Sequence, residues 1–507
     1  MMNKKIIKFS NIKQLSLLFK KKKKKIILCH GVFDLLHLGH LRHFKEAKEL
    51  GDILFVSITE DKFINKGFNR PYFNTNQRLE ALSLINSINY VFVNESKDAI
   101  KSIKELQPDI YCKGQDYKNR NSDITLKIRK EENECKKNGG IIKFTKSEMF
   151  SSSKLLNGIE EKNEKLHKYL TELKLKNSSQ KIIETIDSLD KKEIVLIGET
   201  IIDKYNFCET LGKSGKEPHL VLKKINEENY LGGVIAIAKN LAPLCKSVKV
   251  ISVLGEKKEY LNFIKKNLPN NVKLDLIYKK NSSTICKSRF VDKVNKYKVL
   301  GVYDVDDENL SSKEEKDLSK KIIRSINQDK VVIVSDYGHG MISKKNANLI
   351  CKKSNFLSLN TQINASNKGY HSVSKYKGYN FLIINENELR YELRDRSSNL
   401  KKLSNLIAKK NNIKKVVITK GESGSILYDK KSKNYIECPA LINKVIDKVG
   451  AGDFMLSIMS LLINLKLEDK ASLFVGNLVG AMSVNNMANS EFIDKINLKK
   501  KIIYTLK

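Results

Sequence analysis

The segment from Ile26 to Leu41, IILCHGVFDLLHLGHL, most constrains how this chain can fold. Its apolar start predicts a buried parallel strand that ends in the turn residue Gly31, and a helical pattern begins near His40. A helix that starts directly after a strand and a glycine turn presents free backbone N–H groups and its positive dipole end to an anion. The segment therefore predicts a phosphate site at the carboxyl edge of a parallel sheet.

Two histidines, His37 and His40, stand one helical turn apart in this segment. Imidazoles there can donate hydrogen bonds to phosphate oxygens and stabilise charge that grows during phosphoryl or nucleotidyl transfer. The alternative explanation is a helix-capping or metal-binding histidine pair. The string GVFDLLHLGH resembles the GxFDxxHxGH motif of the cytidylyltransferase-like nucleotidyltransferases. That resemblance implies catalytic roles for His37 and His40 and nucleotide contacts for Gly31 and Phe33.

Length, hydrophobic pattern and cysteine usage limit the classes of protein to which this chain can belong. A length of 507 residues predicts two or three domains, and no apolar run approaches the roughly 20 residues of a membrane span. The lysine-interrupted start predicts a short amphipathic helix, because it lacks the small-residue cleavage site of a signal peptide. Eight cysteines without a C-x-x-C pair argue against a structural zinc site and a disulfide framework. We therefore expect a cytoplasmic protein with no membrane partner.

The formal net charge of +37 invites a nucleic-acid-binding interpretation. The lysines, however, are spread along the whole chain, and the run Lys20 to Lys25 is the only dense block. A solvated charge is the simpler role of such a run. We therefore expect no nucleic-acid partner, and a degenerate binding or nucleic-acid-binding protein stays as the alternative of another class.

Strands and helices alternate through the first part of the chain. Strands are predicted over 53–58, 90–93, 109–112 and 141–144, and helices over 97–106 and 123–137. Such alternation is typical of a doubly wound parallel sheet, here a Rossmann-like domain. Three polar segments would meet at the edge that carries the histidines: a basic stretch over 66–78, Lys113 to Tyr117 directly after a strand, and Ser151 to Ser153 before a helix.

The order of these segments resembles the nucleotidyltransferase half of the bifunctional heptose kinase/adenylyltransferases. That family carries "KG…RP…QR", "PDxxxKGxDY" and a serine-threonine segment in this order, and the match covers about residues 25 to 157. The resemblance implies a catalytic Lys113, a substrate contact for Asp116, and nucleotide contacts for Arg78, Ser151, Ser152 and Ser153. A class I aminoacyl-tRNA synthetase also uses an HxGH turn, but no anticodon-binding pattern follows here.

The charged segment 158–189 has a helical spacing of apolar residues, which predicts two connecting helices with a break at 177–179. A second α/β pattern starts at Glu193, so we expect a nucleotidyltransferase domain over 1–157, a helical linker over 158–189 and a second domain over 190–507. In that domain the polar stretch 212–218 and the following residues 220–224 suit a small β lid over a sugar site.

The chemistry of the second domain is carried by the segment VIDKVGAGDF, residues 445–454. Gly450, Ala451 and Gly452 at a helix start would offer backbone N–H groups to a transferred phosphoryl group. Asp453 would take the proton of the attacking hydroxyl, and the helix dipole would keep it ionised. A glycine-rich turn with a capping aspartate is the alternative. Asn385 and Glu388, at a strand end, would orient Mg²⁺.

The set resembles the ribokinase-like (PfkB) sugar kinases over about residues 191 to 507. The resemblance implies Mg²⁺ with ATP (or CTP) as substrate, nucleotide contacts for Gly421, and a homodimer through the lid. It implies sugar contacts for Asp203, Gly232 and Gly233. Two features depart from the family: the kinase follows the nucleotidyltransferase instead of preceding it, and the sugar-site motifs differ at Ala236 and at Leu359 to Thr361.

Together these patterns predict two doubly wound α/β domains with a bifunctional transferase activity. One domain would phosphorylate a sugar or sugar phosphate, and the other would join a sugar 1-phosphate to a nucleotide. The resemblance implies an ADP-heptose-like product for cell-surface glycan or lipopolysaccharide precursors. A CTP-dependent pair acting on another phosphorylated sugar or polyol is the alternative within enzymes.

Overall fold

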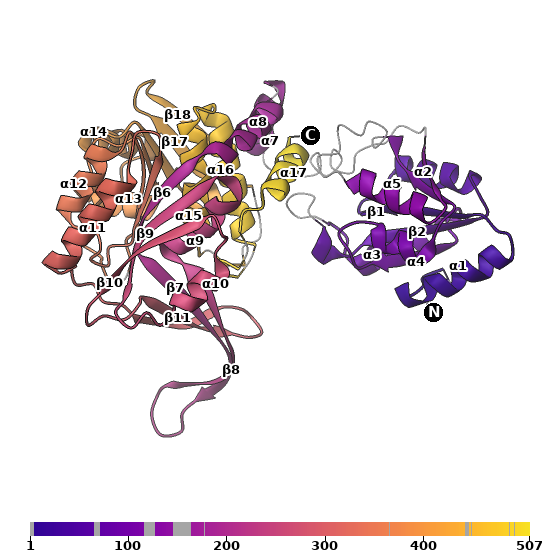
Figure 1. Cartoon of the computed structure of the whole chain (residues 1–507), viewed down its shortest axis with the longest axis horizontal. Coiled ribbons are helices and arrows are strands. Elements are labelled where there is room, and N and C mark those ends of the chain that lie inside the picture. Colours follow the sequence, from indigo (N-terminus) through magenta and orange to yellow (C-terminus); the bar gives the residue numbers. More distant parts are fainter. Residues whose placement is uncertain are drawn as a thin grey trace. The chain divides into compact units, whose positions relative to one another are not determined.

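The computed structural model describes residues 5–64, 71–115, 127–145, 164–176, 178–364, 366–441, 446–447, 449–485, 487–490 and 492–506 (Figure 1). The chain forms two compact units, Met1–Glu164 with Lys499–Lys507, and Lys165–Leu498. No helix among the described residues is long and apolar enough to cross a membrane.

The first unit is built on a five-stranded parallel sheet in the order β3-β2-β1-β4-β5. Its strands are β1 (Ile26–Gly31), β2 (Ile53–Thr59), β3 (Tyr90–Asn94), β4 (Ile110–Lys113) and β5 (Ile141–Phe144). Its helices are α1 (Ile12–Lys21), α2 (Leu38–Glu49), α3 (Thr75–Ser83), α4 (Ile100–Leu106) and α5 (Lys127–Lys137).

Both faces of this sheet are covered. Alternate residues of β1 enter two separate apolar clusters, Ile27 with Cys29 on one side and Ile26 with Leu28 on the other. A strand that is buried on both faces has to be a continuous apolar run, which explains the sequence of β1. The predicted doubly wound arrangement is confirmed, and the expected amphipathic helix before the first strand is α1.

The second unit contains a nine-stranded sheet in the order β10-β9-β6-β13-β14-β15-β16-β17-β18. It is parallel from β10 to β16, and β17 and β18 are antiparallel. Its strands are β6 (Glu193–Gly198), β9 (Ser247–Gly255), β10 (Val272–Lys279), β13 (Val331–Asp336), β14 (Phe356–Thr361), β15 (Phe381–Asn385), β16 (Lys415–Thr419), β17 (Ser425–Asp429) and β18 (Asn434–Cys438).

Helices cover both faces of the large sheet (Figure 1). One face is packed by α11 (Ser312–Ser325), α12 (Lys344–Lys353), α13 (Glu386–Leu393) and α14 (Leu400–Lys410). On the other side lie α9 (Gly233–Leu241), α15 (Ala451–Asn464) and α16 (Asp469–Ser483). The remaining helices are α7 (Glu164–Leu175), α8 (Ser178–Ser188), α10 (Leu261–Asn267) and α17 (Lys495–Thr505).

A separate four-stranded sheet, in the order β12-β11-β7-β8, forms the lid. β7 (Thr200–Lys213) and β8 (Leu220–Gly232) make a long antiparallel hairpin that projects from the second unit in Figure 1. β11 (Cys286–Asp292) and β12 (Lys298–Asp304) complete the sheet. The expected lid is confirmed, but the sequence pattern identified only the segment around its first hairpin.

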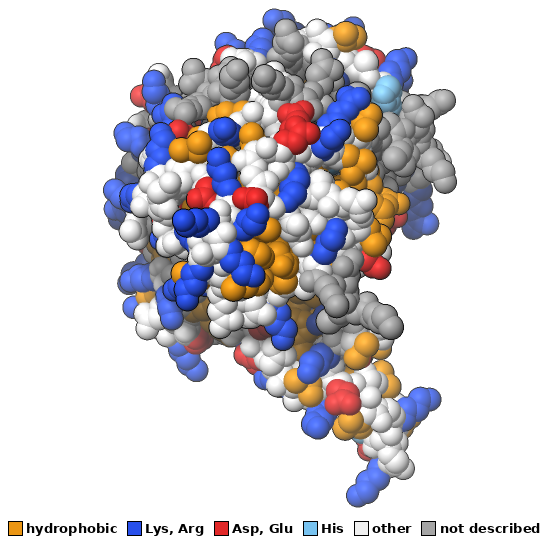
Figure 2. Space-filling view, turned by 90° about the vertical axis from the view of Figure 1, so that its right-hand side faces the viewer, with side chains coloured by type: hydrophobic (Ala, Val, Ile, Leu, Met, Phe, Trp, Pro, Cys, Tyr) orange, Lys and Arg blue, Asp and Glu red, His pale blue; other side chains and the backbone are white. Residues whose placement is uncertain are grey.

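Positive side chains do not form a single stripe on the face that Figure 2 shows. Lysine and arginine are spread over it, with acidic and apolar side chains between them.

Two candidate active sites

The first site lies where β1 ends and α2 begins. His37 is the N-cap residue of α2, and its ring stacks on that of His40 with 3.9 Å between the ring centroids. The ring of Phe33 lies edge-on to His40, at 5.5 Å. A side chain at Gly31 would lie 2.9 Å from the Phe33 ring, so glycine leaves room for this packing. The structure thus brings together four of the residues that the sequence predicted for this site.

Burial lowers the pKa of His37 below its usual 6.5. At neutral pH this imidazole is therefore uncharged, and one ring nitrogen carries a proton to donate. A neutral ring at a helix N-terminus can polarise a phosphate oxygen and is not a strong proton acceptor there.

Lys113, the last residue of β4, is buried beside a buried carboxylate. Its Nζ lies 3.3 Å from Oε2 of Glu131, and the same oxygen accepts a hydrogen bond of 2.8 Å from the Tyr111 hydroxyl. Oε1 of Glu131 accepts from the backbone N–H of Ala99. Burial raises the pKa of Glu131, but the charge of Lys113 and these hydrogen bonds outweigh it, so the net pKa lies below its usual value. Glu131 therefore stays ionised and fixes Lys113.

Arg78 is buried, and its hydrogen bonds fix the loop between β1 and α2. Its guanidinium donates to the backbone carbonyls of Val32 (2.6 Å), Thr59 (2.9 Å) and Phe73 (3.0 Å), and it pairs with Asp61. The sequence predicted a nucleotide contact for this residue. In the structure these donors are directed at protein oxygens, so Arg78 shapes the loop that carries Phe33.

Several predicted residues of this site lie outside the described part of the chain. They are Asp116, Ser151, Ser152 and Ser153, and in the basic segment Lys66, Gly67 and Arg70.

The second site is a cavity of about 860 Å³ in the second unit. It is lined by strand ends of the large sheet, by the start of α15 and by lid residues. Nine of the predicted residues line it: Asp203, Gly233, Asn385, Glu388, Gly421, Gly450, Ala451, Gly452 and Asp453. Gly232 lies behind them, where a side chain would meet the Asp203 carboxylate at 2.4 Å.

The glycine turn at the start of α15 needs glycine at its first position. Gly450 has a φ of +88°, and a Cβ there would lie 2.0 Å from Oδ1 of Asn489. At Gly452, in contrast, a Cβ would meet nothing within 4 Å. Gly450 therefore allows Asn489 to approach the turn, while Gly452 leaves open space at the helix start.

Asp453 lies in the first turn of α15 and accepts a 2.8 Å hydrogen bond from the Tyr337 hydroxyl. Its pKa is raised to about 7, mainly because the protein encloses it, and the negative charges of Asp203 and Glu388 add to this. Tyr337 and Lys287 act in the opposite direction. We expected the helix dipole to keep this carboxylate ionised, and that expectation is wrong as stated: near neutral pH it is only partly ionised.

Asn385 and Glu388 form a reciprocal cap at the start of α13. Oδ1 of Asn385 accepts from the backbone N–H of Glu388 at 2.8 Å, and Oε2 of Glu388 accepts from that of Asn385 at 3.0 Å. Oε1 of Glu388 accepts from the backbone N–H of Ile363. Burial raises the pKa of Glu388 to about 7. Both residues thus serve as helix caps and line the cavity.

The lid contributes two cations that the sequence analysis missed. Lys287 and Arg289 of β11 line the cavity, and Arg289 pairs with Oδ1 of Asp203 at 2.5 Å. Burial lowers the pKa of Lys287, and Asp203 opposes that effect. Residues two apart on a strand share a face, so the K-x-R spacing was a usable signal. Tyr337 was missed because only the folded chain brings its hydroxyl to Asp453.

Asp447 connects the lid to the glycine turn. Its buried carboxylate accepts from the Tyr205 hydroxyl of β7 (2.8 Å) and pairs with Lys298 of β12 (2.6 Å). It also accepts from the backbone N–H of Val449, next to Gly450. These contacts hold the pKa of Asp447 below its usual value against the effect of burial.

Comparisons with known proteins match two families, in the order in which the motifs occur along the chain. The family model described as "pfkB family carbohydrate kinase" matches residues 191–495, and "Cytidylyltransferase-like" matches residues 28–184. A protein named "Bifunctional protein HldE" from Campylobacter jejuni is 27% identical over 338 residues, which are 63% of this chain and 70% of that protein. The protein of that name from Helicobacter pylori is 44% identical over 98 residues, 19% of this chain and 21% of its own.

Among solved structures, phosphofructokinase-2 from Escherichia coli superimposes with a TM-score of 0.51 and 16% sequence identity. The match covers 62% of this chain and 100% of that enzyme. At this identity the likeness establishes the fold alone.

Proposed function

We propose, from the premise that the chain belongs to the pfkB family of carbohydrate kinases, that its second unit phosphorylates a sugar or a sugar phosphate. The cytidylyltransferase-like match precedes the kinase match, which is the domain order that the motifs predicted. The chain is therefore a transferase with a nucleotidyltransferase part and a kinase part, similar to the HldE proteins. The roles of single residues below are our proposals.

In the kinase site, the substrate hydroxyl would attack the γ-phosphorus of ATP, and the bond to the bridging oxygen of ADP would break. Asp453 would take the hydroxyl proton, since its carboxylate lines the cavity at the start of α15. The backbone N–H groups at Gly450, Ala451 and Gly452 would stabilise charge on the transferred group. This assignment rests on one observation: the glycine turn, Asp453 and the lid cations line the same cavity.

Mg²⁺ fits the polar edge of this cavity. Mg²⁺ prefers oxygen ligands and keeps several of its waters, and Asn385 and Glu388 offer an amide and a carboxylate. Each oxygen of Glu388 accepts one backbone hydrogen bond and retains a lone pair for a metal-bound water. When bound, the ion would neutralise charge on the phosphates of ATP.

The lid side of the cavity would hold the sugar. Asp203, fixed by Arg289, would accept hydrogen bonds from sugar hydroxyls. Gly233 lines the same cavity, and the missing side chain of Gly232 leaves room for the Asp203 carboxylate. Lys287 and Arg289 provide positive charge that suits a substrate with a phosphate of its own.

In the first unit, a sugar 1-phosphate oxygen would attack the α-phosphorus of ATP or CTP, and pyrophosphate would leave. His37, His40 and Lys113 would stabilise the charge on the phosphates. Gly31 and Phe33, with Ser151 to Ser153, would contact the nucleotide, and Asp116 the sugar. We infer from the resemblance of its motifs to the bifunctional heptose kinase/adenylyltransferases that the product is an ADP-heptose-like activated sugar used for cell-surface glycan or lipopolysaccharide precursors.

The test is pyrophosphate release by the full chain with ATP and with CTP, each against a panel of sugar 1-phosphates. ADP formation with the matching sugar phosphates is measured in parallel. We expect pyrophosphate with ATP and a heptose 1-phosphate. Release with CTP and another sugar or polyol would favour the alternative enzyme, and no release with any pair would refute the nucleotidyltransferase role.

We also propose the boundaries 1–157, 158–189 and 190–507, and a homodimer through the lid. Exposed apolar side chains on the lid support the dimer: Leu211, Leu220, Leu300 and Val302. Expressed separately, residues 1–160 and 190–507 should each fold cooperatively, and sedimentation of the second fragment should give a dimer. Fragments that do not fold, or a monomer, would contradict these two proposals.

A further inference from the structure

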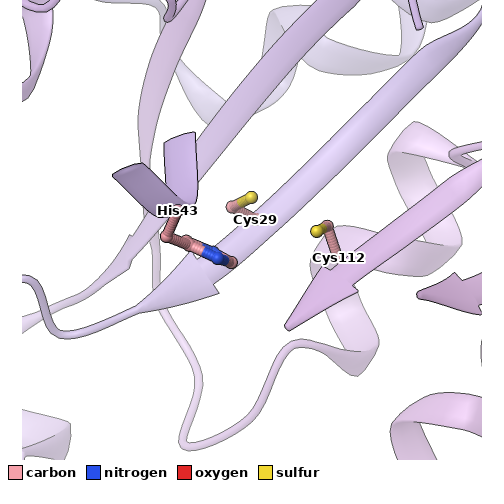
Figure 3. Close-up of side chains that lie close together, drawn as sticks. All are labelled: Cys29, His43 and Cys112. Carbon is pink, nitrogen blue, oxygen red and sulfur yellow. The ribbon is translucent and has the colours of Figure 1, made fainter. Parts of the chain in front are cut away.

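Three side chains of the metal-ligating kinds meet in the core of the first unit. Cys29 of β1, Cys112 of β4 and His43 of α2 each place one sulfur or ring nitrogen within 4.8 Å of the other two (Figure 3). All three residues are buried. None of them belongs to the residues proposed above for catalysis or binding.

The fold itself brings these residues together. Cys29 and Cys112 are direct partners in the register of the neighbouring strands β1 and β4. Their side chains therefore leave the sheet on the same face, and His43 reaches them from α2, as Figure 3 shows. Because the residues are far apart in the sequence and lack a C-x-x-C pair, spacing argued against a zinc site. The register of β1 and β4 brings the two cysteines together, which their spacing in the sequence does not show.

A second hydrogen-bonded layer orients the imidazole. Nδ1 of His43 lies 2.9 Å from Oγ1 of Thr145, and that hydroxyl donates to the carbonyl of Lys113 at 3.4 Å. When this hydroxyl donates to the Lys113 carbonyl, Oγ1 accepts the proton on Nδ1, and Nε2 is the nitrogen that keeps a lone pair for a metal. Metal-binding histidines are commonly fixed in this way through their other ring nitrogen.

We propose that Cys29, Cys112 and His43 bind one thiophilic metal ion of the zinc(II) class. Three ligands at about 2.3 Å from one ion lie about 3.8–4.0 Å apart. The three atoms here, which all lie within 4.8 Å of one another, therefore need to approach by about 1 Å or less to close on it. Two thiolates and a neutral imidazole around Zn²⁺ carry no net charge, which an apolar core tolerates. Binding would release the two thiol protons.

The ion would join the three elements that carry the proposed nucleotidyl-transfer site. β1 ends in Gly31, β4 ends in Lys113, and α2 carries His40 one turn before His43. A metal bound between these three elements would therefore stabilise the geometry of the proposed nucleotidyl-transfer site without touching a substrate.

The first experiment measures metal retained by the full chain. The protein is incubated with zinc, passed through gel filtration and analysed for metal, as wild type and as Cys29→Ser, Cys112→Ser and Cys135→Ser. Cys135 is the matched control, because it is another buried cysteine of the same unit. We expect about one zinc per chain in wild type and Cys135→Ser, and less than about a fifth of that in the other two.

Two further measurements use the wild type alone, so a variant that does not fold leaves the proposal testable. X-ray absorption of the zinc form should give two sulfur ligands and one imidazole, and the unfolding midpoint should rise with zinc and fall back with a chelator. A wild type that retains no zinc, a shell of nitrogen and oxygen only, or equal zinc in all variants would overturn the proposal.

Discussion

The start of α2 in the first unit and the start of α15 in the second are built alike. In both, the first turn of a helix offers free backbone N–H groups, which makes a site for a phosphate. The glycines lie differently: Gly450 is itself the N-cap of α15, whereas Gly31 is the last residue of β1 and His37 is the N-cap of α2. The two helix starts also differ in the side chains added to the turn. At α2 these are two stacked imidazoles, one with a pKa lowered by burial, and at α15 it is a carboxylate with a pKa raised to about 7.

The difference matches the nucleophiles that we propose. A sugar hydroxyl must lose a proton as it attacks, so the kinase site needs a base with a pKa near the working pH. A sugar 1-phosphate is already an anion, so the nucleotidyltransferase site needs charge stabilisation and no proton acceptor. On this proposal a helix N-terminus serves both reactions, and the side chains at the helix start decide which reaction takes place.

Asp453→Asn should have the largest effect. It keeps the shape at the start of α15 but removes the proton acceptor, so sugar phosphorylation should fall by about 10²–10⁴-fold. Binding of ATP should change by less than about tenfold, because the phosphate contacts are backbone groups. Pyrophosphate release by the first unit should be unchanged. Phosphorylation at the wild-type rate would break the comparison, since the second site would then need no base.

His40→Ala should act on the other site. Loss of one donor to the developing charge should reduce nucleotidyl transfer by about 10²–10³-fold. Phosphorylation, measured as ADP formed with the sugar substrate, serves as the control and should stay near wild type. A fall in both activities would indicate that His40 acts on stability and not on the reaction.

Gly450→Ala tests the glycine turn through stability. A Cβ at Gly450 would meet Asn489 at 2.0 Å with φ at +88°, so we expect the second unit to lose about 2 kcal/mol or more. The matched variant is Gly452→Ala, where a Cβ has open space within α15 and should be neutral or slightly stabilising. Denaturant unfolding of both variants gives the comparison. Equal stabilities would show that the turn does not require glycine at its first position.

Tyr337→Phe should have the smallest effect. The pKa of Tyr337 is raised well above 10, so its hydroxyl stays protonated and donates to Asp453. Without this hydrogen bond the pKa of Asp453 rises further, and phosphorylation at pH 7 should fall by about three- to tenfold. The loss should shrink at pH 8.5, where Asp453 is ionised in both proteins. A loss that does not depend on pH would assign Tyr337 to substrate binding instead.

The sequence predicted the strands of the first unit well, because each is a short, mainly apolar run. It missed β11, where Lys287, Ser288 and Arg289 separate the apolar residues, and β12, where Gly301 interrupts them. Local sequence patterns also do not show in which direction a side chain points. Arg78 stands in a basic segment that suits phosphates, yet backbone carbonyls around it turn its guanidinium inward. Glu131 and Tyr337 matter only through partners distant in sequence, which no spacing reveals.

The most direct test of the account is the pH dependence of both half-reactions in one preparation of the full chain. Because Asp453 must be ionised to accept a proton and its pKa is about 7, phosphorylation should rise about tenfold from pH 6 to pH 8. Nucleotidyl transfer should change by less than about threefold, since only the second ionisation of the sugar phosphate, near pH 6, falls in that range. Two profiles that rise together, or a phosphorylation rate that is flat across this range, would contradict the account.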